Sequence, residues 1–520
     1  MNHLIYPTLD LYTYDLRDGL GQNEEAIKES KESFYQKFSV AAPKGIKVYR
    51  PGNSDFKISQ KDIIEDLKKR DGDSNIETEY LELLEYKRVF FDVQDVSRYY
   101  EGYYYPVLLN DLYGLLIDCT IHNKEGKSKE FPAKCFSALK SKIEERRNTE
   151  KKLNEQRRKL GETWFLTAQL PQFMAQSPQE IAQSCYEKLM PEASWKSNLR
   201  GTGYLYGGML FELWGYHSPN QITSQHPKTK HHVIIALYPN EQAAKKAANL
   251  FFDWMRLFGY RSKILWAYGQ ALDLRDKLKK DFVKIQNFID TIVKDKTPKQ
   301  VNLRLFRTVL VEAQDTLASY STNLSYLYDQ IQTIEVNLYN YQRRLEEIKK
   351  NTESSPSSLI LPNILAFMGQ ANDLTFLEEF SEVFGEKYLL QVQKDYSNFS
   401  PGLKLLDDLI NSVRGITEID QAERDRTFQA IVGVVGVGLG VGAAVASIAG
   451  HFPFVSEANQ ERALEHPFGI YLSRFVPDPW VAPSISLLVS LVAALFAGIV
   501  AGGVIGLVLL WQRRSPFRRK

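Results

Sequence analysis

Two long apolar segments dominate the hydrophobic pattern of this chain. Residues 427–450 and 484–511 contain no Asp, Glu, Lys, Arg or His. Each is long enough to cross a bilayer, because about 20 apolar residues in a helix span the hydrocarbon core. Neither segment has the alternation of a strand or the turn spacing of a barrel. The pattern therefore predicts two transmembrane helices, 427–450 and 484–511.

The charges around these segments predict their orientation. The tail 512–520 is basic, whereas the loop 451–483 is net acidic. By the positive-inside rule the tail lies in the cytoplasm and the loop lies outside. Two crossings then return everything before residue 427 to the cytoplasm. We expect a multi-pass protein of the cell (inner) membrane, with the lipid bilayer as partner and both termini cytoplasmic.

The strongest pattern before these spans is helical. Apolar residues follow one another at spacings of three and four from Leu303 to Ile348, which is the a/d seam of a coiled coil. The same spacing runs from Leu278 to Ile292, and Pro298 marks a turn between the two stretches. We predict a helical coiled-coil region over 263–400, in which the seam suits packing within one chain or between chains.

A stalk helix is expected over 401–426. Ser400 is typical of a helix N-cap and Pro401 of the first helical position, where a missing N–H costs nothing. An apolar stripe continues from Leu403 toward Thr427. The pattern predicts one continuous helix that starts outside the membrane and becomes the first span.

Residues 161–262 alternate between strand and helix patterns. Strands are predicted at 164–170, at 204–217, where Gly207 and Gly208 allow a hairpin, and at 232–238; helices are predicted at 178–189 and 240–258. The order strand, helix, two strands, helix is most of a ferredoxin-like βαββα unit.

Residues 1–160 form a mixed α/β region. A helix is predicted at 24–38, strands at 88–93 and 113–122, and an exposed charged helix at 137–160. The tyrosine-rich stretch 99–105 is expected to connect the strands. The fold class is thus an α+β cytoplasmic region with a ferredoxin-like unit and long coiled-coil helices, joined to a two-helix transmembrane hairpin.

Small residues recur along both predicted spans, where they let helix backbones approach closely. The pore or helix-packing candidates are Gly433, Gly436, Gly440 and Ser447 in the first span, and Ser486, Ser490, Ala494, Gly498, Gly502 and Gly506 in the second. Two explanations of these small residues are equally good. They could pack the two helices of one hairpin together, or they could pack subunits of a symmetric oligomer whose first span lines a central path. The lack of ionisable residues disfavours a proton relay.

Composition and motifs add little chemistry. The 520 residues carry a net charge of +2 with no basic stripe outside the tail, which argues against a nucleic-acid partner. The three cysteines are expected as free thiols. Gly436–Gly442 lacks the strand of a dinucleotide fingerprint, and Gly126-Lys127-Ser128 has Ile121 where a P-loop needs glycine.

Three histidines are the weak metal candidates: His226, His231 and His232. They have no cysteine nearby and no second acidic cluster. No nucleophile lies beside a base in the sequence, and no pattern identifies a cofactor. We therefore expect a protein that is not an enzyme.

The layout resembles that of the CorA-type magnesium channels. The shared features are a large α/β region, long coiled helices, a stalk that enters the first span, an outer loop, a second span and the basic tail Arg513–Lys520. The resemblance implies a homopentamer, a pore lined by the first span, and divalent cations bound between cytoplasmic domains. The family's Gly-Met-Asn signature is absent, since the chain has Ala449-Gly450-His451-Phe452-Pro453 at that place.

Two functional hypotheses follow. The first is an oligomeric CorA-like ion channel or transport protein whose large cytoplasmic domain senses a ligand. The alternative is a membrane-anchored sensing or signalling effector without transport activity, in which the hairpin only anchors and oligomerises the chain.

Overall fold

The computed structural model describes thirteen stretches of the chain and divides them into two compact units. The described residues are 3–17, 24–37, 47–50, 53–57, 60–72, 79–94, 98–123, 130–146, 159–171, 176–215, 231–294, 303–353 and 371–419. Unit 1 comprises Met1–Asp273 and Asp329–Val392, and unit 2 comprises Leu274–Tyr328 together with the chain from Gln393 onward.

All described strands belong to unit 1 and form one mixed sheet. They are β1 (His3–Leu16), β2 (Lys47–Arg50), β3 (Asn53–Lys57), β4 (Leu81–Glu82), β5 (Val89–Gln94), β6 (Arg98–Leu109), β7 (Leu112–Asn123), β8 (Glu130–Pro132), β9 (Lys159–Gln169), β10 (Leu199–Leu205), β11 (Gly208–Gly215) and β12 (His231–Tyr238). Their order is β10-β11-β12-β9-β1-β7-β6-β5-β2-β3, with β4 beside β6 and β8 beside β1. Only the β9–β12 pair is parallel.

The described helices range from one turn to very long. They are α1 (Glu24–Gln36), α2 (Gln60–Gly72), α3 (Cys135–Arg146), α5 (Pro178–Leu189), α6 (Trp195–Asn198), α7 (Glu241–Ala248), α8 (Phe251–Lys294), α9 (Leu303–Glu353), η2 (Thr375–Leu377), α11 (Glu378–Val383), η3 (Phe384–Leu389) and α12 (Leu390–Ile419). The chain is therefore an α+β protein, with a mixed sheet followed by long helices.

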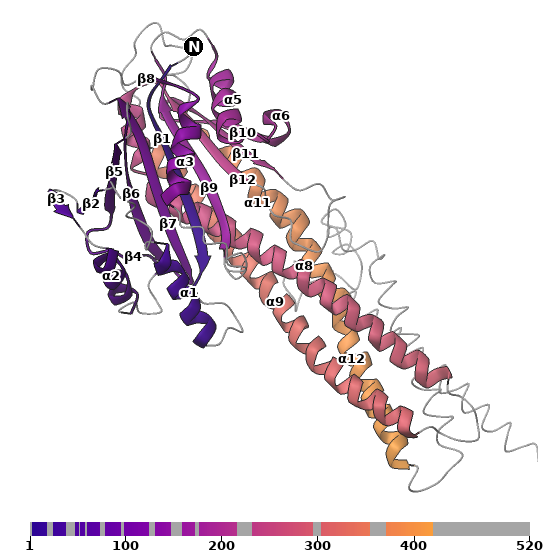
Figure 1. The fold of residues 1–520 in the computed structure, drawn as a ribbon. Helices are drawn as coiled ribbons and strands as arrows, with labels where there is room; N and C mark the ends of the chain where they lie inside the picture. The colour runs from indigo at the N-terminus through magenta and orange to yellow at the C-terminus, as the bar shows by residue number, and fades with distance from the viewer. Residues whose placement is uncertain are drawn as a thin grey trace, which may run out of the picture. The chain divides into compact units, whose positions relative to one another are not determined.

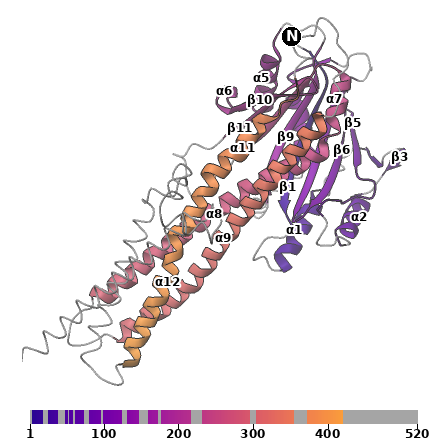
Figure 2. The same ribbon diagram turned by 180° about the vertical axis from the view of Figure 1, so that it is seen from behind.

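Helices cover both faces of the sheet in unit 1. On one face, α3 and α5 pack on a core that includes Trp164, Leu166 and Tyr186, and α3 lies in front of the strands in Figure 1. On the other face, Phe258 of α8 packs against Tyr12 and Phe165. The reverse view in Figure 2 shows this face, with α8 and α11 in front of the strands. The central strands are thus buried on both sides.

Several strands of the N-terminal region were not predicted, and two of them are long. β1 occupies residues 3–16, and β6 includes the tyrosine stretch 99–105 that we expected to be a connection. Alternate tyrosines of β6 point to opposite faces: Tyr100 and Tyr104 are buried, whereas Tyr99 and Tyr103 are partly exposed. Because tyrosine stands on both faces, the stretch lacks the polar alternation of a half-exposed strand. The predicted charged helix 137–160 is also wrong at its end. α3 ends at Arg146, and Lys159 already belongs to β9.

Between β9 and α8 the elements differ in detail from the predicted ones. Tyr206 and Gly207, both with positive φ, form a tight turn that splits the predicted strand 204–217 into the hairpin β10–β11. The predicted helix 240–258 is two helices, α7 and α8. α5 has the predicted limits, and Ser177 and Glu180 close a capping box at its start.

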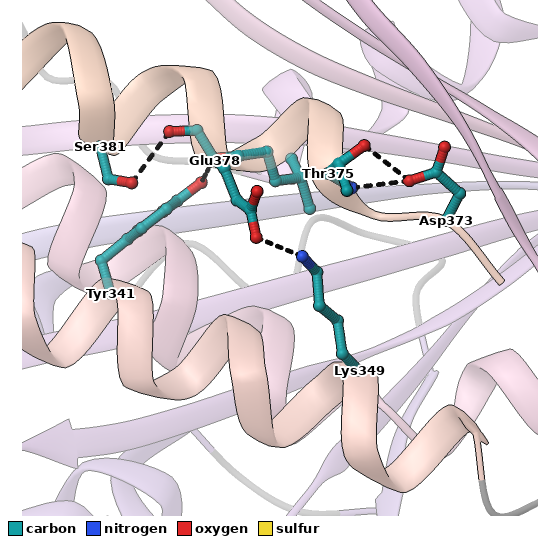
Figure 3. A network of polar contacts seen from close by, with 7 residues as sticks. Tyr341, Lys349, Asp373, Thr375, Glu378 and Ser381 are labelled. Carbon is teal, nitrogen blue, oxygen red and sulfur yellow. Dashed lines mark hydrogen bonds and ion pairs between the residues drawn. The ribbon is translucent and has the colours of Figure 1, made fainter.

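A short segment after α9 caps the edge of the sheet at β10. Tyr204 and Asp373 exchange both backbone hydrogen bonds at 2.8 Å. Figure 3 shows how the segment is held: Asp373 accepts from Thr375, Lys349 of α9 pairs with Glu378, and the Tyr341 hydroxyl donates to the Leu377 carbonyl at 2.9 Å. The segment therefore covers the edge strand at Tyr204, where both backbone groups are paired within the chain.

Unit 2 consists of three helical segments that share an apolar core. The core contains Leu278, Ile285, Phe306, Ala313, Tyr320, Leu324, Leu406, Leu409 and Val413, all buried. The seam predicted in α9 is buried along its length, from Phe306 in unit 2 to Ile348 in unit 1. Since this burial occurs in a single chain, the seam is used for packing within the chain.

The predicted helix start at Ser400 is wrong. α12 runs from Leu390 to Ile419, so Pro401 lies inside the helix. Proline has no N–H for the Ser397 carbonyl, and the Ser400 hydroxyl donates to that carbonyl instead, at 3.3 Å. The next residue, Gly402, gives the Tyr320 hydroxyl room to approach, since a Cβ there would lie 2.4 Å from it. Side chains thus compensate for the proline.

The predicted membrane spans lie outside the described residues, as do all ten pore or helix-packing candidates, Gly433 to Gly506. Among the helices that the structure describes, none is both apolar enough and long enough to cross a bilayer.

The edge cap makes a prediction about Gly203. A Cβ at this position would lie 2.2 Å from the Asp373 carbonyl oxygen and 2.5 Å from the Phe376 ring. We expect Gly203→Ala to lower the free energy of unfolding by about 1–3 kcal/mol, because the cap must move away. Chemical denaturation followed by tryptophan fluorescence measures this.

Gly385→Ala is the matched control, because Gly385 lies in a helix of the same unit and nothing lies within 4 Å of an added Cβ. Alanine there should leave stability unchanged or raise it by up to about 1 kcal/mol. Equal effects of the two substitutions would contradict the tight fit at Gly203.

Candidate functional site

Polar side chains form a row across β1, β7 and β6 on the sheet face that also contacts α8. The antiparallel register places Asp10 opposite Asp118, and Asp118 opposite Tyr103. Two residues further along, Thr8 lies opposite Thr120, and Thr120 opposite Glu101. Directly opposed residues have Cβ atoms about 5 Å apart, so their side chains interact. We call these six residues the polar row.

The two aspartates of the polar row share a hydrogen bond between their carboxyl groups. Burial raises the pKa of Asp10 well above its usual value, and the charge of Asp118 raises it further. Burial also raises the pKa of Asp118 to about 6, although the Asp10 hydrogen bond and Arg88 act in the opposite direction. Asp10 therefore holds the shared proton, and Asp118 carries the charge at neutral pH.

Arg88 provides the positive charge beside this pair. Its guanidinium lies 4.5 Å above the ring of Tyr103 and 4.5 Å above that of Phe251, which is the first residue of α8. The same charge lowers the pKa of both aspartates. Burial keeps Tyr103 neutral by raising its pKa well above the usual value. The row thus combines an acid pair, an arginine and a phenol.

The outer end of the row is more exposed. The His122 imidazole lies 2.7 Å from the Glu101 carboxylate, and this hydrogen bond lowers the pKa of Glu101. The rings of Tyr6 and Tyr99 flank His122 at 6.5 and 6.3 Å. The hydroxyls of Thr8 and Thr120 are 2.9 Å apart. The side chain of Glu101 is 46% exposed, so this end can exchange protons with solvent.

The chemistry that the row supports is proton storage and exchange. Its carboxylates lie within one layer of side chains, and the His122 imidazole contacts Glu101 at the exposed end. Within the described stretches no three His, Cys, Asp or Glu residues come together as a metal site would require.

A second polar group on the same face is closed to solvent. The Thr163 hydroxyl lies 2.7 Å from Nδ1 of His232, and Nε2 of His232 lies 3.0 Å from Glu212. Burial raises the pKa of Glu212 to about 7 and lowers that of His232 well below its usual value. Thr163, His232 and Glu212 are thus connected in the same order as the nucleophile, the base and the orienting acid of a catalytic triad. Thr163 is only 1% exposed, however, so no substrate can reach it and the group is structural.

The predicted histidine candidates do not come together. His231 and His232 are consecutive residues of β12, and consecutive strand residues point to opposite faces. Nε2 of His231 lies 2.5 Å from the Tyr186 hydroxyl on one face, whereas His232 bonds Glu212 on the other. The two side chains therefore cannot hold the same metal ion. His226 lies outside the described residues.

Sequence reasoning missed the polar row. Asp10 lies between Leu9 and Leu11, and Asp118 between Ile117 and Cys119, all four of which are buried. A single acid between two buried residues of a strand is the signal that could have drawn attention to each aspartate. Their pairing was not accessible, because it depends on the register of two strands far apart in the sequence.

Comparisons with known proteins gave no relative. No family model matches the chain, and no curated protein or solved structure matches it significantly.

The acid pair predicts a pH dependence of stability. The folded pKa of Asp118 is about 6 against 3.8 for an ordinary aspartate, so the folded state binds more protons between these pH values. Stability should therefore fall as the pH rises from about 4 to about 6, by up to about 3 kcal/mol from Asp118. Asp118→Asn should reduce this slope without removing it, because burial also raises the pKa of Asp10.

Denaturation midpoints measured from pH 4 to pH 7 for both proteins provide the comparison. Asp92→Asn, a partly buried residue of β5 outside the row, is the control and should keep the slope. An unchanged slope in Asp118→Asn would show that the pair does not titrate as proposed.

Proposed function

We propose that this chain is an oligomeric membrane protein of the ion-channel or transport type, in which the α+β region senses a ligand. The two apolar segments 427–450 and 484–511 supply the membrane part of this proposal. The described elements supply the rest: a mixed sheet covered by helices on both faces, followed by three long helices, α8, α9 and α12. This order supports the CorA-like layout.

The observation that carries the proposal is the course of α12. It continues as a helix through Pro401 to Ile419, a few residues before the predicted span at Thr427. Within unit 2, its residues Leu406, Leu409 and Val413 are buried in the common core with α8 and α9. α8 and α9 also contribute to unit 1. A change in their packing therefore has a helical path toward the first predicted span.

Further details of the proposal extend the sequence analysis. We propose a homo-oligomer, with five subunits if the CorA-like geometry applies, in the inner membrane with both termini cytoplasmic. β9, α5, β11 and β12 would form the ferredoxin-like unit, since β12 is parallel to β9 and antiparallel to β11. The partly exposed polar row would serve as a proton-sensitive surface of the sensing region.

A membrane-anchored effector without transport activity is the second candidate. One observation favours it: the seam of α9 is buried within a single chain, so it gives no reason to expect association between chains. The absence of Gly-Met-Asn after the first predicted span points the same way. In this case the α+β region would bind its ligand or partner independently of the hairpin.

Reconstitution of the full chain into liposomes tests the first proposal. We expect passage of Mg²⁺ or another cation, read by an entrapped dye, at least tenfold above protein-free liposomes. Gly440→Leu should abolish it if the first span lines the path, because leucine would fill the space left by glycine. Gly385→Ala, in the described helical part, should leave it unchanged.

Replacing residues 420–520 with an unrelated membrane anchor separates the two candidates. A channel loses all flux, whereas an anchored effector keeps its biological activity. Absence of flux under every ion and pH tested, with activity retained by the exchanged anchor, would reject transport.

A further inference from the structure

A small cavity in unit 1 has the chemistry of a ligand site. Its volume is about 180 Å³, and it lies between the β6–β7 turn, α8 and α9. At about 30 Å³ per water molecule this is space for about six waters. Drug-sized ligands need about 300 Å³ or more. The cavity therefore suits a small metabolite and excludes a nucleotide.

The walls combine polar and apolar side chains from separate parts of the sequence. Asn110 and Asp111 form the two-residue turn between β6 and β7, and Asn110 has a φ of 51°, as such turns require. The backbone N–H of Arg17 donates to the Asp111 carbonyl at 2.8 Å and holds the turn. The Asp111 carboxylate pairs with Lys263 of α8. This wall is therefore fixed before any ligand arrives.

Glu79 is the other acidic residue of the lining, and its ion-pair partner is Arg344, which does not line the cavity. Glu79 lies 3.8 Å from Arg344 of α9. Arg344 is itself held by Asp253 at 3.2 Å and Glu347 at 2.6 Å. Both carboxylates of the lining thus have a cation other than Arg256 within 4 Å.

Arg256 is the lining cation whose charge is not matched. Its guanidinium lies 4.8 Å from the centre of the Tyr80 ring. Its Nε is buried and has no hydrogen-bond partner, and within the described stretches no carboxylate pairs with it. A buried guanidinium N–H without an acceptor is costly, and a carboxylate is the group that satisfies it best.

Two amide side chains of α9 in the same lining suggest the other polar group of the ligand. Asn337 is 7% exposed, and its Nδ2 donates to the Thr333 carbonyl at 2.7 Å, which leaves its Oδ1 as an acceptor. Asn340 lines the cavity one turn further along α9. A hydroxyl or ammonium group on the ligand would donate to these amides.

We propose that this cavity binds a small organic carboxylate with a hydroxyl or amino group, its carboxylate on Arg256 and its donor group on Asn337 and Asn340. Such a ligand connects α8 with α9 inside unit 1. As the signal read by a sensing region, it rests on the proposed function. Binding itself is measured without any flux assay, so the two proposals fail separately.

Saturation-transfer NMR on the full chain in detergent tests the proposal with lactate as the probe. Lactamide is the control ligand, because it differs only in replacing the charged carboxylate with a neutral amide. We expect saturable binding of lactate and at least tenfold weaker binding of lactamide. Arg256→Gln should weaken lactate binding at least tenfold, because it removes the unmatched charge.

Two more variants keep the result interpretable. Asn340→Leu fills the cavity from the α9 side and should also weaken lactate binding at least tenfold, so it decides the outcome if Arg256→Gln does not fold. Arg307→Gln, at an exposed position of the same helix, should bind lactate as the parent chain does. The inference is overturned by no saturable lactate binding, by equal binding of lactamide, or by undiminished binding in the folded cavity variants.

Discussion

Burial of the central strands on both faces is the constraint on which most of this structure depends. β1 and β9 lie between α3 and α5 on one side and α8 on the other. A polar side chain on either strand is buried away from water, so it must form its hydrogen bonds with other groups of the protein. The shared proton of Asp10 and Asp118 and the chain from Thr163 through His232 to Glu212 are two solutions to this requirement. The Tyr14 hydroxyl, which donates to the Met255 carbonyl at 2.7 Å, is a third.

The buried polar groups differ in how far solvent can reach them, and only a group that solvent reaches is a candidate for a functional role. The Glu212 group is closed to solvent, and the charges of Arg261 in α8 and Glu379 in α11 act on the pKa of Glu212. The polar row continues past the start of α8 to partly exposed Glu101 and His122. Side chains of the same kind are therefore closed to solvent at one place and partly open to it at the other.

The sequence predicted local elements well and their long-range associations poorly. The three- and four-residue spacing of α9 and the Ser177–Glu180 capping box are local signals, and both elements formed where expected. β6 was missed because tyrosines occupy both its buried and its partly exposed face, which removes the alternation that identifies a strand. Pro401 was misjudged because the compensating groups, Ser400 and Tyr320, are a neighbouring side chain and a residue of another helix. The Asp10–Asp118 pair and the Arg256 cavity depend on register and packing, which no local pattern encodes.

The cap on β10 affects how far the length of the preceding connection can vary. An uncovered edge strand is a template onto which a second sheet can dock, and lateral growth of this kind leads to aggregates. Here the template is occupied by Asp373, which the chain brings back after α9. The entropy of closing a loop grows only with the logarithm of its length, by about 0.6 kcal/mol per doubling. Evolution can therefore lengthen or shorten the connection between α9 and the cap while Asp373 still occupies the β10 edge at Tyr204.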